Sequence, residues 1–280
     1  MTDGHARSFK SALELPDEVR KPLADLLLTL ADNKRLLGLR YSDWILGAPA
    51  LEAGISCSAM AQDEWGHGRI LYAMLRDFGH DPDRLEHERE ASEYRNIELL
   101  DSPIGEWPEL LALNLLVDSA LTVVFESMEE SRFEPLHYKV RKLLDEERFH
   151  FEHGRGWTIR LASSERGREA LRVAFQPAWE ACLRWFGPSD DALGVALAEV
   201  GVMTAGPDAL RARWLGKVGP VVGSAGLELA VRENGAWKSR AEPSWKDWSA
   251  ERRRRSEGGG PDPDTLARVR GDRNRALLLD

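Results

Sequence analysis

A glutamate followed three residues later by a histidine occurs twice within rows of apolar residues, and this repeat constrains the fold more than any other feature of the chain. The copies are Glu64 with His67, and Glu147 with His150. Side chains three residues apart on an α-helix lie on one face, and both pairs interrupt rows of apolar residues that would face a core. Burying a charge without a partner is costly. The repeat therefore predicts two helices that face each other across a polar, buried site.

Apolar residues at helical spacing predict helices along almost the whole chain. The expected helices span residues 17–44, 49–78, 108–130, 135–161, 166–186, 190–203 and 207–232, with a weaker segment at 91–100. No alternating pattern typical of strands competes with them. The fold class that follows is all-α: a four-helix bundle with additional C-terminal helices, formed by residues 1–233.

The tail, residues 234–280, differs in composition and is expected to be irregular, with a short helix over 265–279. It contains a basic run, Arg252–Arg255, which is either a solvated segment or a site for an anionic ligand or acidic partner surface. Three tryptophans, Trp237, Trp245 and Trp248, either pack on the bundle or anchor a partner.

Metal binding is the main interpretation of the repeated pattern. Paired Glu-x-x-His helices in a four-helix bundle hold two iron or manganese ions, with one carboxylate from each remaining helix. Asp118 interrupts the buried row of helix 108–130 and is the natural bridging carboxylate. The structural alternative is a set of buried Glu–His pairs, with Asp118 paired to an arginine or to a helix backbone group.

The first helix does not supply the expected carboxylate. Its inward row leaves positions 33 and 34 for the middle of the core, and these are Asn33 and Lys34. Asp32 lies about 200° around the helix from Lys34, so both cannot face one site. Either Asp32 or Asn33 reaches the metal in a different register, or the Lys34 ammonium partly neutralises the carboxylates and displaces one metal ion. Lys34 on the helix edge, with its ammonium in solvent, is the remaining alternative.

Two further pairs with the same spacing are expected to be unrelated to the site. Glu134 and His137 flank a proline at a helix start, outside any apolar row. Asp77 and His80 lie at a helix end, where a histidine interacts favourably with the helix dipole.

Charge and cysteine content exclude several classes of protein. The chain has 38 basic and 47 acidic side chains, a formal net charge of -9, so bulk nucleic-acid binding is not expected. Two cysteines are too few for a disulfide framework and fit a reducing cytoplasm. We expect no membrane association, because no segment approaches the roughly 20 apolar residues of a membrane span.

These motifs resemble those of the phenylacetyl-CoA epoxidase family, which belongs to the bacterial multicomponent di-iron oxygenases. Segments 62–68, 116–118 and 146–150 look like the ligand motifs of the catalytic subunit. Segments 30–33, 41–44, 128–131 and 155–157 look more like the paralogous structural subunit. The resemblance covers most of residues 23–232.

The resemblance implies a ferritin-like bundle in which two irons activate dioxygen for attack on an aromatic acyl-CoA, with electrons from a separate reductase. It assigns metal ligation to the following residues of this chain: Glu64, His67, Asp118, Glu147 and His150. The family's helix-one glutamate is not matched, so a site with a single iron, or one with manganese, is an alternative to the two-iron site. Two functions follow: an oxygenase component, or a structural subunit that binds a homologous catalytic chain or itself. A ferritin-like protein with peroxidase or metal-handling activity is a third possibility.

Overall fold

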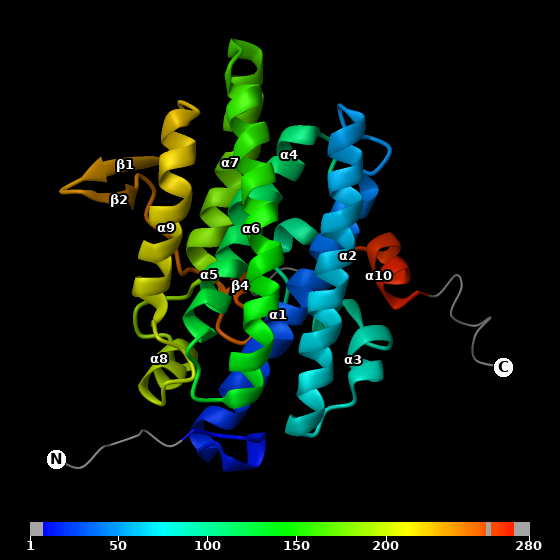
Figure 1. Cartoon of the computed structure of the whole chain (residues 1–280), viewed down its shortest axis with the longest axis vertical. Helices are drawn as coiled ribbons and strands as arrows, with labels where there is room; N and C mark the ends of the chain where they lie inside the picture. Colours follow the sequence, from blue (N-terminus) through cyan, green and yellow to red (C-terminus); the bar gives the residue numbers. More distant parts are fainter. Residues whose placement is uncertain (1–7, 256–258, 272–280) are drawn as a thin grey trace.

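The computed structural model describes residues 8–255 and 259–271, and it shows a bundle of long, roughly antiparallel helices (Figure 1). Four helical segments form the central bundle: α1 (Asp17–Asp43), α2 (Leu51–Met74), the helix Trp107–Met128, and α6 (Glu134–Ala162). α1 and α2 are antiparallel neighbours joined by a short turn (Figure 1). The all-α expectation is confirmed.

The helix Trp107–Met128 is the core element. It consists of α4 (Trp107–Ala112), a π-helical segment (Leu113–Asp118) and α5 (Ser119–Met128). By length and composition it could cross a membrane, contrary to our expectation that no such segment exists, yet 94% of its apolar window is buried inside the molecule. It is apolar because other helices surround it.

Further helices flank the bundle. α7 (Glu165–Trp185) and α9 (Pro207–Ser224) lie beside α6, and α8 (Ala192–Glu199) joins them at one end (Figure 1). α3 (Pro82–His87) follows α2 and was not predicted. The predicted segment 91–100 forms only two 3-10 turns, Ala91–Glu93 and Glu98–Leu100.

The prediction that strands are absent is wrong for residues 230–255, which include most of the described tail. β1 (Ala230–Glu233) and β2 (Ala236–Ser239) form an antiparallel hairpin, which ends the predicted helix 207–232 early. β3 (Trp248–Ser249) and β4 (Arg254–Arg255) form a second, shorter pair. α10 (Pro263–Arg270) is shorter than the helix predicted over 265–279, whose last residues lie outside the described part of the chain.

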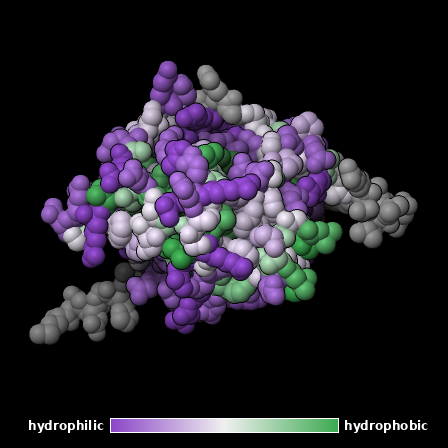
Figure 2. Space-filling view, turned by 90° about the horizontal axis from the view of Figure 1, so that it is seen from above, coloured by the Kyte–Doolittle hydropathy of each residue, from purple (hydrophilic) through white to green (hydrophobic). Residues whose placement is uncertain are grey.

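The tail packs on the bundle. The ring of Trp237 lies so close to Gly219 and Gly223 of α9 that a Cβ at either position would meet it at 2.6–2.7 Å. The two central arginines of the basic run are buried rather than solvated: Arg253 pairs with Asp191, and Arg254 pairs with Asp101. These contacts favour the packing interpretation of Trp237 and contradict a solvated Arg252–Arg255 segment. Figure 2, a view from above, shows mainly hydrophilic side chains at the surface, with separate hydrophobic groups among them.

Candidate metal centre

The five predicted ligands converge in the middle of the bundle. They come from α2, the π-helical segment and α6, and all are almost fully buried: Glu64, His67, Asp118, Glu147 and His150. Four of them, all except His67, offer ligand atoms that lie within 4.8 Å of one another. The histidine of the first pattern is close by, with His67 Nδ1 3.2 Å from Glu147 Oε1. We call these five residues, together with Lys34, the central cluster.

Lys34 points into the cluster rather than to solvent. Its Nζ donates hydrogen bonds to Glu64 Oε1 at 2.9 Å, to Asp118 Oδ1 at 2.6 Å and to Glu147 Oε1 at 2.5 Å. Burial alone would lower the pKa of Lys34, but attraction to the three carboxylates outweighs it and raises that pKa well above its usual value. Lys34 is therefore a cation shared by three acids.

The carboxylates share this cation unequally. Burial would raise the pKa of Asp118, yet Lys34 and His150 hold it well below its usual value. Burial and the neighbouring Asp118 raise the pKa of Glu64 to about 7. Asp118 is thus the more firmly ionised of the two. The negative charge of Glu64 is less well compensated, because it is buried beside other carboxylates.

Both histidines turn Nδ1 toward the cluster and Nε2 outward. His150 Nδ1 lies 3.0 Å from Asp118 Oδ2, and its Nε2 lies 3.3 Å from Asp63 Oδ2. His67 Nε2 lies 2.6 Å from Glu146 Oε2. Each helix thus supplies the outer carboxylate for the histidine of the other helix, which fixes both rings so that Nδ1 can face a metal.

Two hydroxyl groups complete the surroundings of the cluster. Tyr41 donates to Asp118 Oδ2 at 3.0 Å and accepts from Asn114 Nδ2 at 2.9 Å. Thr122 donates to Glu147 Oε2 at 2.8 Å. The π-helical segment carries both Asn114 and Asp118, in keeping with the frequent occurrence of such segments at functional sites.

Asp32 and Asn33, the alternative helix-one ligands, do not face the cluster. Asp32 pairs with Arg89 and accepts from Tyr72 at 2.6 Å. The Asn33 amide donates to the carbonyl oxygen of Thr29 at 2.8 Å and accepts from the Ile97 N–H at 2.9 Å. These groups instead anchor the segment that follows α3.

The next position on the Lys34 face of α1 is a glycine, and a tryptophan ring occupies the space beside it. A Cβ at Gly38, one turn after Lys34, would lie 2.7 Å from the Trp65 ring. Helix one therefore offers the cluster a lysine and, two turns on, Tyr41, but no carboxylate.

Sequence reasoning did not identify Tyr41, Thr122, Asp63 and Glu146 as members of the site. A signal existed for three of them: Tyr41 lies seven residues after Lys34, and an acid directly precedes each pattern's glutamate. His137, from the pair at residues 134 and 137, lies outside the cluster's contacts, and its Nδ1 lies 2.6 Å from the carbonyl oxygen of Glu129.

The donor set fits iron. Carboxylates and imidazoles in this arrangement are the ligands of iron and manganese in helical bundles. Glu64 Oε2 is buried and has no hydrogen-bond partner among the described residues, as expected of an atom available to a metal. Lys34 already supplies one positive charge among the carboxylates, which limits the charge that bound metal needs to add.

Comparison with solved structures supports a ferritin-like fold. The chain superposes on a mutant of an R2-like ligand-binding oxidase with an aerobically reconstituted Mn/Fe cofactor. The TM-score is 0.56 at 15% identity, and the match covers 76% of this chain and 84% of that one. At this identity the likeness concerns the fold.

The family follows from the sequence comparison. The model of the "Phenylacetic acid catabolic protein" family matches residues 1–251, so the chain belongs to that family. It is also 27% identical over 205 residues to a subunit of the 1,2-phenylacetyl-CoA epoxidase of Escherichia coli (strain K12), covering 72% of this chain and 82% of that protein. The resemblance inferred from the motifs is confirmed.

Proposed function

We propose that this chain is an oxygenase component of the phenylacetyl-CoA epoxidase type, acting on an aromatic acyl-CoA or a similar substrate. The observation that carries the proposal is the convergence of four buried carboxylate and imidazole residues whose ligand atoms lie within 4.8 Å of one another, with His67 beside them and with Glu64 Oε2 lacking a hydrogen bond among the described residues. The residues that would hold the metal are Glu64, His67, Asp118, Glu147 and His150. When bound there, iron supplies dioxygen activation.

The protein's own residues prepare the site in three ways. Asp63 and Glu146 hold the outer nitrogens of the two histidines, so both rings keep Nδ1 turned inward. Tyr41 and Thr122 fix the orientation of two carboxylates by hydroxyl hydrogen bonds. Lys34 holds a proton on Nζ between the carboxylates, in the place of a second divalent cation's charge.

A structural subunit is the second candidate, and Lys34 favours it. Three ion pairs from one buried ammonium offset carboxylate repulsion without any metal. In this alternative the chain binds a homologous catalytic chain, and its cluster stabilises the bundle. The similarity to one subunit of an epoxidase is consistent with either role.

Iron stoichiometry distinguishes the two candidates. We would reconstitute wild type and Lys34→Glu anaerobically with Fe(II) and measure iron per chain. The matched control is Lys139→Glu, the same charge change at an exposed position of α6. An oxygenase component should bind roughly one iron, rising toward two in Lys34→Glu, and should lose it in the double variant His67→Ala, His150→Ala.

The opposite result is equally clear. If both wild type and Lys34→Glu bind less than about 0.2 iron per chain, a threshold that allows for incomplete loading, the metal-binding role is ruled out and the structural subunit is favoured. Equal iron content in wild type and Lys34→Glu would show that Lys34 does not set the stoichiometry.

We also propose that the chain pairs with a homologous oxygenase subunit or with itself through its outer helices, and receives electrons from a separate reductase in the cytoplasm. Three apolar side chains at the start of α2 and in the turn before it are exposed: Leu46, Leu51 and Ile55. A stable interface should bury at least about 1,000 Å² in total. Light scattering showing a monomer at micromolar concentration, with no homologous chain bound on coexpression, would contradict this pairing.

A further inference from the structure

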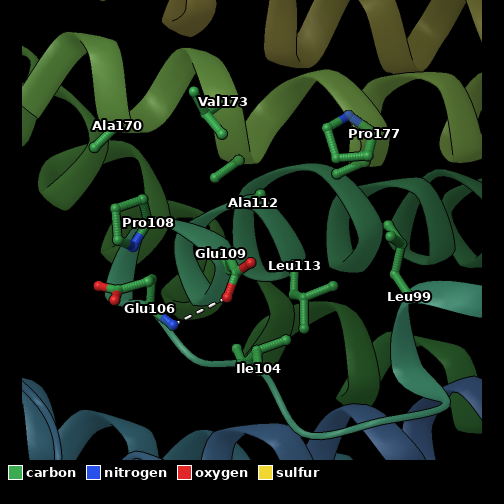
Figure 3. Close-up of a pocket in the computed structure, with 12 residues that line it drawn as sticks. Leu99, Ile104, Glu106, Pro108, Glu109, Ala112, Leu113, Ala170, Val173 and Pro177 are labelled. Atoms are coloured by element: carbon green, nitrogen blue, oxygen red, sulfur yellow. Dashed lines mark hydrogen bonds between the residues drawn. The ribbon is translucent and has the colours of Figure 1, made fainter.

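A cavity of about 360 Å³ lies between α4 and α7 (Figure 3). Its walls come from the segment before α4, from the end of α4 and the start of the π-helical segment, and from one face of α7. Apolar residues that line it include Ile104, Ala112, Leu113, Ala170, Ala174 and Ala178. None of these residues belongs to the metal centre described above.

The hollow arises from side-chain size. Ala170, Ala174 and Ala178 are four residues apart, so they lie along one face of α7. Alanine fills little space, and Ala112 faces the same cavity from α4 (Figure 3). An engineered apolar cavity of about 150 Å³ accepts benzene. The larger volume of this cavity therefore suits a ligand of two fused aromatic rings.

The polar groups at the cavity are acceptors or acids. Glu106 and Glu109 line it, and Glu109 Oε2 accepts from the backbone N–H groups of Gly105 and Glu106 at 2.9 Å each, which holds its carboxylate in place. No lysine, arginine or histidine is among the described residues that line the cavity.

One carbonyl oxygen of α7 lacks its usual helical donor. Pro177 has no N–H to donate to the carbonyl oxygen of Val173, four residues earlier, and both residues line the cavity. A ligand with an O–H or N–H group could bond there.

We propose that this cavity binds a non-anionic, two-ring aromatic molecule that carries a hydrogen-bond donor, at a site separate from the central cluster. The apolar walls supply the binding energy, and the carbonyl oxygen of Val173 accepts from the ligand's donor. The two glutamates disfavour anions, so the site does not suit the polyanionic acyl-CoA of the proposed function. The ligand would lie behind the helix that carries Asn114 and Asp118.

The test uses the full chain and three naphthalenes that differ in charge. Isothermal titration at pH 7 should show one 1-naphthol per chain, with a Kd of roughly 10–100 µM, as the ligand's size allows. The anion 1-naphthoate should bind at least about five-fold more weakly, because of repulsion by the nearby carboxylates. The cation 1-naphthylmethylamine should bind no more weakly than 1-naphthol.

Ala174→Phe should fill the cavity and weaken 1-naphthol binding at least about ten-fold, because the ring would occupy the ligand's volume. Ala59→Phe, on an exposed position of α2, is the matched control and should leave binding unchanged. No binding of 1-naphthol to wild type, or equal binding to Ala174→Phe, would overturn the site. Binding of 1-naphthoate as tight as that of 1-naphthol would overturn the assigned ligand class.

A chemical readout covers the case in which Ala174→Phe does not fold. In Ala174→Cys, 1-naphthol should slow alkylation of the new thiol by iodoacetamide several-fold, whereas absence of protection contradicts the site. The background is low because both native cysteines are buried, and burial raises the pKa of the Cys57 thiol to about 12 and that of Cys182 higher still.

Discussion

Lys34 Nζ lies 2.6 Å from Asp118 Oδ1, and both groups are buried in the centre of the bundle. Removing one partner of a buried ion pair leaves an uncompensated charge. Lys34→Ala should therefore lower the free energy of unfolding of the metal-free protein by about 3–5 kcal/mol, measured by urea denaturation in the presence of a chelator.

The same experiment has an internal check. Lys142→Ala removes an exposed lysine from α6 and should cost less than about 1 kcal/mol. Excess Fe(II) should restore part of the loss in Lys34→Ala, because metal charge replaces the missing ammonium. A loss below about 1 kcal/mol in Lys34→Ala would show that the cluster does not depend on this ion pair.

Gly38 and Trp65 define a second relationship that substitution can test. A Cβ at Gly38 would lie 2.7 Å from the Trp65 ring and 3.1 Å from the carbonyl oxygen of Ala61. Overpacking should make Gly38→Ala about 1–2 kcal/mol less stable, despite the better helix propensity of alanine.

Thermal and urea denaturation of a double-mutant cycle would measure this contact. In the Trp65→Ala background, Gly38→Ala should be neutral or stabilising, giving a coupling energy of about 1 kcal/mol or more. Gly66, which has open space at its Cβ position, is the matched control, and Gly66→Ala should stabilise by up to about 1 kcal/mol. Additive effects of the two substitutions would contradict the steric account.

The helical fold and the inward-facing residues of the site could be predicted from the sequence because both depend on periodicity. In α6 the buried residues, including Glu147 and His150, recur every three or four positions, as an amphipathic helix requires. The periodicity of apolar residues in α1 likewise predicted that Lys34 lies near the middle of the core.

What the sequence did not show depends on contacts between distant segments. Asp32 does not face the cluster, because Arg89, 57 residues away in the chain, pairs with its carboxylate. The buried arginines of the tail follow the same rule, since their acids lie far away in the chain. The small hairpins were not predicted because their strands have four residues or fewer. Such strands are too short to show a clear alternation of apolar and polar residues.

Arg254 offers a test of the tail's structural role. It is buried, donates from Nη1 to Asp101 Oδ1 at 2.9 Å, and reaches the carbonyl oxygen of Asn96 at 3.3 Å. Arg254→Ala should cost about 3 kcal/mol of unfolding free energy, because it removes the ion pair of Asp101 and leaves that carboxylate only the hydrogen bond from the Asn96 amide. Arg255→Ala, at the adjacent exposed position, should change stability by less than about 0.5 kcal/mol. Equal effects of the two substitutions, measured by urea denaturation, would mean that the basic run is solvated after all.

His153 predicts a pH dependence that one substitution can isolate. Burial and the neighbouring His150 lower the pKa of His153 to about 4, while its Nδ1 lies 3.3 Å from Asn114 Oδ1. The unfolded chain, with an ordinary histidine pKa near 6.5, therefore binds more protons than the folded protein between about pH 4 and pH 6.5. The contribution of His153 to stability is present above pH 6.5 and is lost as the pH falls through this window.

His153→Gln removes the titrating group and leaves an amide that can still donate to Asn114. Relative to wild type, it should gain about 2 kcal/mol of unfolding free energy between pH 7.5 and pH 4.5, with little difference at the higher pH. Urea denaturation of both proteins at a series of pH values measures the gain, and Glu64 and the other titrating groups cancel because both proteins contain them. Parallel curves for the two proteins would show that His153 has an ordinary pKa in the folded state.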